Sequence, residues 1–307
     1  MKKIYFFFFT LLIIFHSQAQ EIHPADSSRK LLGPFMLWSR NELLRNVYDP
    51  ERGYFQKAFT DKDDPRFMIT NEDETFKFGI GGFVNVLAFM DFDGMVEFPD
   101  FVTSQIPVPM GKERGQFGLG AANSRINFKV VGKAKKQTIV GFIETDFRGT
   151  GNALRLRHAY ISYFGFTVGQ TWSTFMDLEA GPPTIDQEGP NTQIATRQPM
   201  IRYSGNFTPK FSFSVALEMN TPLIFDYSSF GIQTEYPHLP DIPAILKFKD
   251  KFGHVQLAGI VRAMNYYDDT LSHSSITEWG YGGAISGKFN LPGKFYIYYQ
   301  AVAGKGI

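Results

Sequence analysis

Apolar and polar side chains alternate with a period of two along much of the chain from Thr75 onward. Between Thr75 and Phe92 none of the even positions is polar, whereas the odd positions include Lys77, Asn85 and Asp91. This alternation predicts a β-strand with one apolar face and one mixed face. The run exceeds the usual strand of about 5–6 residues in globular domains and suits a tilted membrane strand with an extension.

The alternation recurs in later segments. Clear examples of polar residues separated by apolar ones are Arg125, Asn127 and Lys129, then Glu144 and Asp146, and the run from Phe211 to Asn220. We count about eleven segments, joined by alternating short and long connections. This arrangement is typical of an all-β, antiparallel transmembrane barrel with tight turns at one end and long loops at the other. A soluble β-sandwich is the alternative, but it prefers shorter strands.

The N-terminal region has the layout of an export signal. Met1-Lys2-Lys3 precedes an apolar run from Ile4 to Phe15, and small residues follow up to Ala19. We therefore predict a signal peptide over residues 1–19, because the apolar run is shorter than the about 20 residues that a membrane helix needs. A retained N-terminal anchor is the alternative.

Residues 20–74 are polar and irregular, and we interpret them as a periplasmic segment. Phe35 to Val47 is a weak helical candidate, and a disordered linker is an equally open interpretation. Residues 75–307 form the predicted outer-membrane β-barrel.

Composition narrows the function classes. Aromatic residues make up 16% of the chain, which a barrel can carry on its lipid face and interfacial girdles. The chain has no cysteine, so thiol chemistry is excluded, and no metal-ligand spacing or enzyme motif is found. We expect no cofactor, no metal and no catalytic residue. The formal charge of +1 becomes −1 without Lys2 and Lys3 (+1 − 2 = −1), which argues against a nucleic-acid partner.

Alternation stops between Gln170 and Arg202, and a loop of this length in a regular barrel is usually functional or disordered. We predict a constriction loop over residues 172–196 that folds into the lumen. Its four acids are Asp177, Glu179, Asp186 and Glu188. The alternative is an outward surface loop whose acids are solvated.

Arginines lie in the segments that flank this loop, and we predict that they line the pore. They are Arg125, Arg155, Arg157, Arg197 and Arg202. An arginine that faces lipid costs about 2–4 kcal/mol at the bilayer midplane, so these faces should point inward. Arg197 and Arg202 have opposite parity, so both can line the pore only if a bulge falls near Pro199 or if one lies beyond the membrane. Guanidinium groups opposite an acidic loop would favour small carboxylic acids. Alternatively, the arginines pair with the loop acids and hold the loop in place.

Several motifs resemble the DcaP-like family of outer-membrane porins. They are Gly81-Gly82-Phe83-Val84-Asn85-Val86, Asn123-Ser124-Arg125-Ile126-Asn127-Phe128, Arg155-Leu156-Arg157-His158-Ala159-Tyr160, Val168-Gly169-Gln170-Thr171-Trp172-Ser173-Thr174-Phe175 and Arg197-Gln198-Pro199. The resemblance spans about Phe76 to the end of the chain. It implies a homotrimeric, sixteen-stranded channel in outer-membrane lipid, an inward-folded loop and a preference for small anionic solutes such as dicarboxylates. It also implies that Arg125, Arg155, Arg157 and Arg197 are pore-lining.

Two features depart from this family pattern. Residues 20–74 show no sustained heptads, whereas family members can carry an N-terminal coiled coil. The chain ends in mid-pattern at Gly304-Lys305-Gly306-Ile307, and closure needs an even and larger number of strands, so we expect an incomplete barrel that lacks C-terminal strands. The predicted function is that of a passive diffusion porin. The alternative is a non-transport barrel, either a lipid-modifying enzyme or a surface adhesin.

Overall fold

A computed structural model of the chain describes most of its second half and several shorter stretches of its first half. The described residues are 30–32, 35–38, 67–71, 75–92, 115–134, 137–184, 189–190, 193–219, 232–234, 237–268 and 274–307. The predicted signal peptide, residues 1–19, lies outside them.

The described residues form β-strands and three short 3-10 helices. Eleven strands have seven or more residues: β4 (Phe76–Phe83), β7 (Arg125–Ala134), β8 (Gln137–Asp146), β9 (Arg155–Tyr163), β10 (Phe166–Trp172), β11 (Arg197–Asn206), β12 (Phe211–Glu218), β14 (Ile242–Asp250), β15 (Gly253–Asp268), β16 (Ser274–Leu291) and β17 (Phe295–Lys305). Six are shorter: β1 (Lys30–Leu32), β2 (Phe35–Trp38), β3 (Phe67–Asn71), β5 (Leu87–Asp91), β6 (Gln116–Gly120) and β13 (Ile232–Thr234). The long strands match the count made from the alternation.

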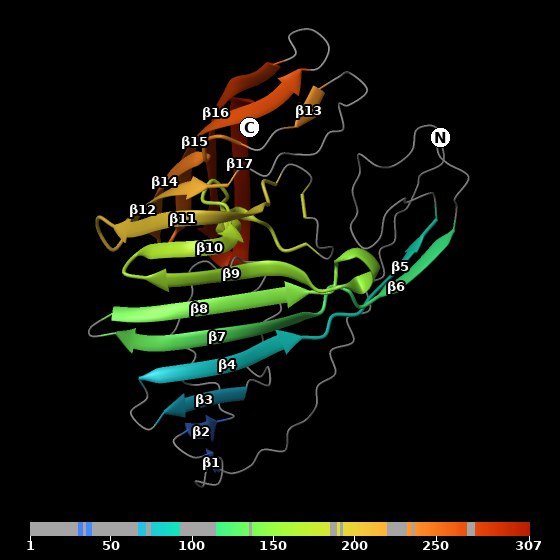
Figure 1. The fold of residues 1–307 in the computed structure, drawn as a ribbon, viewed down its shortest axis with the longest axis vertical. Helices are drawn as coiled ribbons and strands as arrows, with labels where there is room; N and C mark the ends of the chain where they lie inside the picture. The colour runs from blue at the N-terminus through green and yellow to red at the C-terminus, as the bar shows by residue number, and fades with distance from the viewer. Residues whose placement is uncertain are drawn as a thin grey trace.

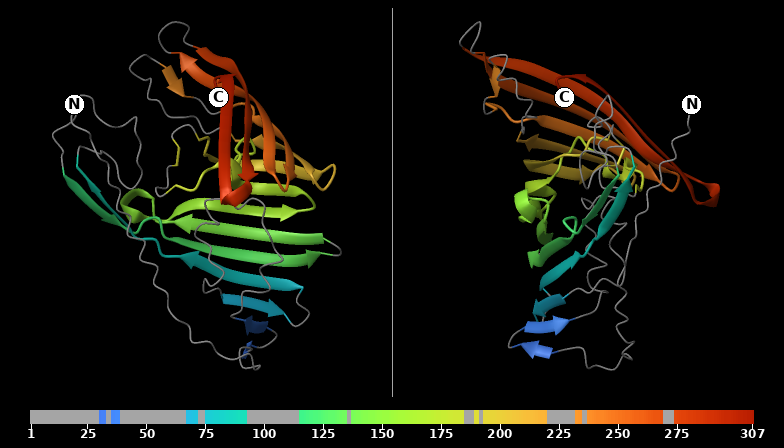
Figure 2. Two further views of the ribbon diagram at one scale, coloured as in Figure 1. Left: turned by 180° about the vertical axis from the view of Figure 1, so that it is seen from behind. Right: turned by 90° about the vertical axis from the view of Figure 1, so that its right-hand side faces the viewer.

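Fifteen of the strands form one antiparallel sheet. Its order is β1-β2-β3-β4-β7-β8-β9-β10-β11-β12-β14-β15-β16-β17, and β13 pairs with β15. The sheet twists and curves around a concave interior (Figures 1 and 2). No ladder joins β17 to β1 within the described residues, so the sheet is not closed. The predicted all-β, antiparallel architecture is confirmed.

Short turns gather at one end of the sheet, as expected for hairpins in a barrel. The connection between β9 and β10 consists of Phe164 and Gly165, which both have positive φ angles, 51° and 81°. Positive φ at both central residues is the signature of a type I′ turn, which suits the twist of the two strands. The hairpins β7–β8, β11–β12, β14–β15 and β16–β17 turn at the same end. We call it the short-turn end. The longer connections, among them that between β10 and β11, begin and end at the opposite end.

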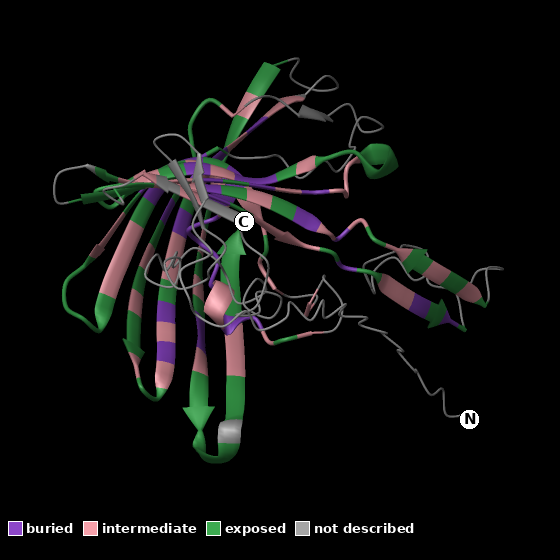
Figure 3. Cartoon of the chain, turned by 90° about the horizontal axis from the view of Figure 1, so that it is seen from below, coloured by how far each residue is buried: buried purple, intermediate pink, exposed green. Residues whose placement is uncertain are grey.

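The two faces of the sheet have opposite character, and the usual rule for soluble proteins is reversed. Apolar side chains such as Ile143, Ile161 and Val168 are exposed, whereas charged side chains such as Arg125 and Glu144 are buried. Bands of buried, intermediate and exposed residues follow one another along the strands (Figure 3). In a soluble protein, exposed apolar faces of this extent and buried charges are both rare. A lipid-facing exterior and a polar interior account for both observations.

Aromatic rings cluster near the short-turn end. The ring centroids of Phe166 and Tyr203 are 4.9 Å apart, and those of Phe211 and Phe248 are 4.8 Å apart. Each pair joins neighbouring strands. Rings placed in this way form the girdle that marks a membrane interface.

The long alternating run from Thr75 to Phe92 is split into two strands. It forms β4, then leaves the sheet at Val84, and continues as β5, which pairs with β6 in a separate hairpin that extends away from the sheet (Figure 1). Alternation reports which face each residue occupies, but it does not report which strand is the partner. The single strand predicted here is therefore two strands.

The sheet begins before Thr75. Strands β1, β2 and β3 come from the segment that the sequence predicted to be a periplasmic lead-in, and they extend the sheet beyond β4. The helix predicted from Phe35 to Val47 is wrong over Phe35–Trp38, which is strand β2, because pairing with two neighbours outweighs a weak helical periodicity. Residues 39–47 lie outside the described residues.

Within the described part of the chain, no helix is both long enough and apolar enough to cross a membrane.

Candidate functional site

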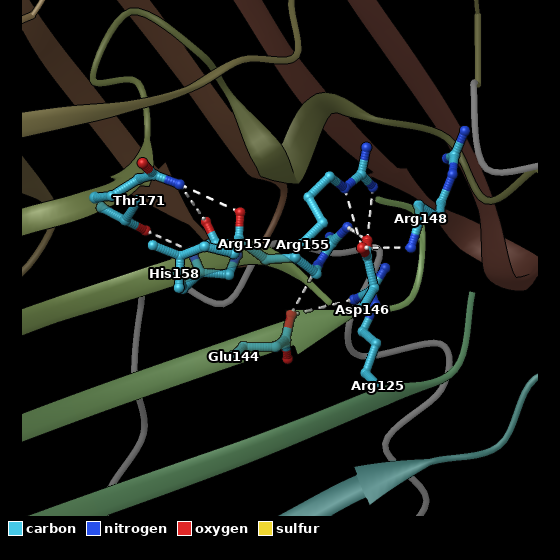
Figure 4. A network of polar contacts seen from close by, with 10 residues as sticks. Arg125, Glu144, Asp146, Arg148, Arg155, Arg157, His158 and Thr171 are labelled. Carbon is cyan, nitrogen blue, oxygen red and sulfur yellow. Dashed lines mark hydrogen bonds and ion pairs between the residues drawn. The ribbon is translucent and has the colours of Figure 1, made fainter. Parts of the chain in front are cut away.

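Three arginines and two carboxylates meet on the concave face at the end opposite the short turns. Arg125 is the first residue of β7, Arg155 is the first of β9, and Asp146 is the last of β8. Glu144 and Arg157 each lie two residues inside these strand ends, on β8 and β9. Figure 4 shows the guanidinium groups gathered around the two carboxylates. We call these five residues the arginine cluster.

The arginine cluster is tightly connected. Arg155 donates from Nε and Nη2 to the two oxygens of Asp146, at 3.0 and 2.6 Å. Arg157 donates from Nε to Glu144 Oε1 and from Nη1 to Asp146 Oδ2, both at 3.0 Å. Arg125 Nη1 lies 3.6 Å from Glu144 Oε1. The five groups carry a formal charge of +1 (+3 − 2 = +1), so positive charge is in excess.

A β-bulge supplies the extra arginine. Glu144 is paired with His158, but the next residue, Thr145, is paired with Leu156, so Arg157 is inserted between them. In a regular ladder Arg157 would share the outward face of Ile161. The bulge instead places Arg157 on the concave side with Arg155, because a bulge re-aims the side chain of the residue that it inserts.

The side chain of Gln170 supports this bulge. Its Nε2 lies 3.3 Å from the carbonyl oxygen of Leu156 and 3.4 Å from that of Arg157. The regular pairing of β9 with β10 ends at Ala159 and Gln170. The amide of Gln170 therefore donates to carbonyl groups that lie beyond the end of the ladder.

Arg197 and Arg202 both contact Trp172, but from different positions. The guanidinium carbon of Arg197 lies 4.3 Å from the centre of the Trp172 ring, and Arg202 Nη1 donates to the Trp172 carbonyl oxygen at 3.3 Å. The pairing of β11 with β10 is regular from Arg197 to Tyr203, so no bulge falls near Pro199. Arg197 is instead the first residue of its strand, and Arg202 is buried on the concave side. The charges of the three clustered arginines act on the Arg197 guanidinium, so Arg197 lies beside the arginine cluster.

The first part of the loop after β10 crosses to the opposite wall. It contains the short helix η4 (Leu178–Ala180), which contacts β16 and β17. Asp177 accepts hydrogen bonds at its Oδ2 from His254 Nε2 at 2.8 Å and from Ser286 Oγ at 2.9 Å. Lys247 Nζ lies 3.1 Å from the other oxygen of Asp177. Strands β14, β15 and β16 therefore hold this loop through one carboxylate.

Glu179 and Glu218 add two further anchors. Glu179 accepts from Lys249 Nζ at 2.7 Å, on β14. Glu218, on β12, is almost fully buried and accepts from Ser173 Oγ at 2.7 Å and from the backbone N–H of Thr174 at 2.6 Å. The start of the loop is thus attached to β12 and to strands β14, β15 and β16.

Burial and hydrogen bonding act in opposite directions on the Asp177 carboxyl, which lies in the loop. Burial alone raises its pKa, but the hydrogen bond with His254 and the charge of Lys247 outweigh this effect and hold the pKa well below its usual range. The pKa of Glu179 is also lowered, since the charge of Lys247 and the hydrogen bond with Lys249 outweigh the effect of its burial. Both acids are ionised at neutral pH.

The arrangement differs from an arginine ladder facing an acidic loop. Asp177 and Glu179 form ion pairs with Lys247 and Lys249, and Asp177 also accepts a hydrogen bond from His254. The arginine cluster is bridged by its own carboxylates, Glu144 and Asp146. Asp186 and Glu188 lie outside the described residues. The sequence did not identify the residues that pair with the arginines or with the loop. These residues are Glu144, Asp146, Glu218, Lys247, Lys249, His254 and Ser286. The one available signal was the parity of Glu144 and Asp146, which share a strand face.

Within the described residues, no group of three or more His, Asp or Glu side chains could hold a metal ion.

No curated protein matches the chain. Among solved structures it is similar to the crystal structure of the outer membrane channel DcaP of Acinetobacter baumannii, with a TM-score of 0.62 and 22% sequence identity. The alignment covers 76% of this chain and 65% of that chain, so the chain spans less than two thirds of that channel. A family described as DcaP outer membrane protein matches residues 55–306. Since this match covers most of the sequence, the chain belongs to the DcaP outer membrane protein family and lies in the bacterial outer membrane.

Proposed function

We propose that the chain forms the wall of a channel through which small anionic solutes, dicarboxylates among them, diffuse across the outer membrane. The observation that carries the proposal is the arginine cluster. Three guanidinium groups and two carboxylates lie on the polar concave face, at the end opposite the short turns. A ring of fixed positive charge in a water-filled lumen favours the passage of anions.

The chemistry of the arginine cluster supports a carboxylate ligand. A guanidinium presents paired donors that match the two oxygens of a carboxylate, as Arg155 already does with Asp146. The Arg155 side chain is 37% exposed, so it can also contact a solute. A dicarboxylate can present one carboxylate to each of two guanidinium groups, so that both can be held by paired hydrogen bonds.

The loop supports the same proposal. Its start crosses the concave face and therefore narrows the lumen, and its acids Asp177 and Glu179 are held against lysines of the opposite wall. The negative charges of Asp177 and Glu179 are thereby offset locally. An anion that approaches the arginine cluster meets less repulsion than it would beside a free acidic loop.

Single-channel recording in planar bilayers tests the proposal. The reversal potential under a KCl gradient reports the ratio of anion to cation permeability, and succinate replaces chloride in a second series. We expect wild type to prefer anions and a variant with Arg155→Ala and Arg157→Ala to lose most of that preference. Lys251→Ala is the matched control, because Lys251 lies in the turn between β14 and β15, away from the arginine cluster.

Two outcomes would contradict the proposal. An unchanged reversal potential in the double variant would remove the arginine cluster as the source of selectivity. Correct membrane insertion without any conductance would favour a non-transport barrel, such as a lipid-modifying enzyme or an adhesin.

A further inference from the structure

The guanidinium of Arg197 differs from those of Arg155 and Arg157 in how its hydrogen-bond donors are used. Arg155 and Arg157 each donate to carboxylate oxygens through two nitrogens. Within the part of the chain that the structure describes, no hydrogen bond or ion pair joins the Arg197 guanidinium to another residue, and its close contact is the Trp172 ring. A guanidinium carries five N–H donors. Those of Arg197 therefore remain available to a bound ligand.

Trp172 fixes the position of this guanidinium. The two residues are directly opposite each other in the ladder of β10 and β11, and the guanidinium carbon lies over the ring, 4.3 Å from its centre. The ring itself packs edge-on against the His158 ring, with centroids 5.7 Å apart. A cation over an aromatic face is attracted by the electrons of the ring. Because this contact uses the flat face of the guanidinium, the edges that carry the N–H donors stay clear of the ring.

Arg197 lies in the polar interior beside the arginine cluster. It is half-buried, and Trp172 lines a cavity on the concave side. The charges of the three clustered arginines act on Arg197, and each acts more strongly than the carboxylate of Asp146. An anion beside Arg197 reduces this repulsion between like charges. Geometry and electrostatics therefore both favour an anionic ligand at this position.

We propose that Arg197, positioned by Trp172, is the residue that binds the carboxylate of the solute and determines which anions the channel holds. The arginine cluster then supplies the positive field, and Arg197 supplies the selective contact. This inference deepens the proposed function and rests on it. The N–H groups on one edge of a guanidinium match the two oxygens of a carboxylate, whereas chloride has no second acceptor atom to use the pair.

Lysine at this position would keep the charge but lose the selective contact. An ammonium is a compact point charge on a flexible chain, so it does not present paired donors from a plane stacked on an aromatic ring. Two properties should therefore separate in Arg197→Lys. The preference for anions over cations stays, because the formal charge is the same, whereas the preference for a carboxylate over chloride falls.

Trp172 reports binding directly, because it contacts the guanidinium. The chain has three tryptophans, so Trp38→Phe with Trp279→Phe leaves Trp172 as the remaining one. Succinate is titrated into the full chain, folded in detergent micelles, at constant ionic strength set with potassium chloride. We expect a saturable change in the Trp172 emission, because a bound carboxylate offsets the charge that lies over the ring. Chloride alone should produce no saturable change.

Variants in the same background locate the site. Arg197→Lys should weaken the apparent succinate affinity by about tenfold or more, as expected for the loss of paired charge-assisted hydrogen bonds, and should leave the reversal potential under a KCl gradient unchanged. Arg262→Lys is the matched control and should change neither property, because Arg262 lies on β15 and pairs with Asp241. The gel mobility of heated and unheated samples shows whether each variant is folded. If Arg197→Lys does not fold, Arg197→Gln takes its place in the affinity measurement.

Trp172 is tested as a positioning residue through its coupling to Arg197. Trp172→Leu removes the aromatic face, so we expect a weaker succinate affinity, measured as the succinate concentration that halves the single-channel KCl current. The double variant Trp172→Leu/Arg197→Lys should be no weaker than Arg197→Lys alone, because the ring acts through the guanidinium. Additive losses would mean that Trp172 contributes independently and would contradict its assigned role.

The outcomes separate this inference from the proposed function. A loss of succinate affinity in Arg197→Lys, with an unchanged KCl reversal potential, supports Arg197 as the selective contact. A non-saturable emission change, an equal effect of chloride, unchanged affinity in Arg197→Lys or an equal loss in Arg262→Lys would overturn it and leave the proposed function standing. A wild-type channel without anion preference would overturn the proposed function, which the KCl measurement reports independently of succinate.

Discussion

Arg157 and His158 are consecutive in the chain, yet both side chains are buried on the concave face of the sheet. Arg157 donates to Glu144, and His158 Nδ1 lies 3.0 Å from Thr171 Oγ1. In an unbroken strand, neighbours point to opposite faces. The bulge opposite Glu144 permits the exception. It adds one arginine to the lumen while the residues on either side keep their orientation.

This geometry makes the deletion of Arg157 informative. Without Arg157, Leu156 and His158 become neighbours and the ladder between β8 and β9 becomes regular. We therefore expect the variant to fold, so that heated and unheated samples differ in gel mobility as they do for wild type. We also expect it to lose part of its anion preference in the reversal-potential measurement.

Deletion of Ile161 is the control, because Ile161 lies in the regular part of β9. A one-residue deletion there reverses the faces of the residues that precede it. Tyr160 would then turn from the concave side to lipid, and we expect this variant not to fold. If both deletions behave alike, the bulge does not have the role assigned to it.

Glu144→Gln tests the balance of charge in the arginine cluster. Glu144 lies against both Arg157 and Arg125, and all three side chains are largely buried. Removal of its charge should raise the preference for anions and lower the free energy of unfolding by about 3 kcal/mol, because two buried cations lose a partner. Reversal potentials and urea unfolding in detergent measure the two effects. A stability equal to that of wild type would contradict the buried ion pairs.

Asp177→Asn should release the loop from the opposite wall. The ion pair with Lys247 and the charge-assisted bond with His254 are lost, which should weaken the anchor by about 3 kcal/mol. We expect a larger and noisier single-channel conductance. Glu179→Gln is the control, because its partner Lys249 is 54% exposed and such pairs contribute about 0–1 kcal/mol.

The same anchor predicts a pH dependence. The pKa of Asp177 is lower in the folded protein than in the unfolded chain, where it is about 3.9. Its stabilising effect is therefore complete above about pH 4 and is lost as the pH falls through the folded value. Acidification below about pH 4 should raise the wild-type conductance toward that of Asp177→Asn, and the variant should show no such rise. A parallel rise in both proteins would exclude Asp177 as the titrating group.

Adjacent positions on β9 test which face contacts lipid. Ile161 is exposed and outward, whereas Ser162 lines a cavity on the concave side. Ile161→Arg should lower the free energy of unfolding in liposomes by about 2–4 kcal/mol if the site is near the midplane, and Ser162→Arg should lower it by much less. The reverse order would mean that the faces have been assigned the wrong way round.

The fold could be predicted well where the period of two is long. The eleven long strands and the faces of Arg125, Lys129 and Glu144 follow from parity, since every side chain must face either lipid or water. Strands β1, β2 and β3 could not be predicted in the same way, because they have three to five residues and too few alternations. The family resemblance noted from the motifs around Arg155 and Gln170 is confirmed.

The site could be predicted less completely, for two physical reasons. Parity alone assumes an unbroken strand, so it cannot reveal a bulge such as that at Arg157. The partners of the loop are also distant in the chain, since Asp177 contacts Lys247, His254 and Ser286, which lie 70, 77 and 109 residues away. Contacts of this range depend on how the sheet curves, and no local pattern encodes that curvature.

The separation of the two sheet faces has a consequence for how this protein can evolve. Outward positions such as Ile143 and Val168 need to satisfy hydrocarbon alone, so one oily residue can replace another there with little effect. Inward side chains form specific hydrogen bonds and ion pairs with neighbouring strands. A substitution at one inward position therefore favours a compensating substitution on the next strand. Over time the outward and inward positions of each strand should therefore accumulate substitutions at different rates. Adaptation to a new solute should change the inward residues and leave the outward residues unaffected.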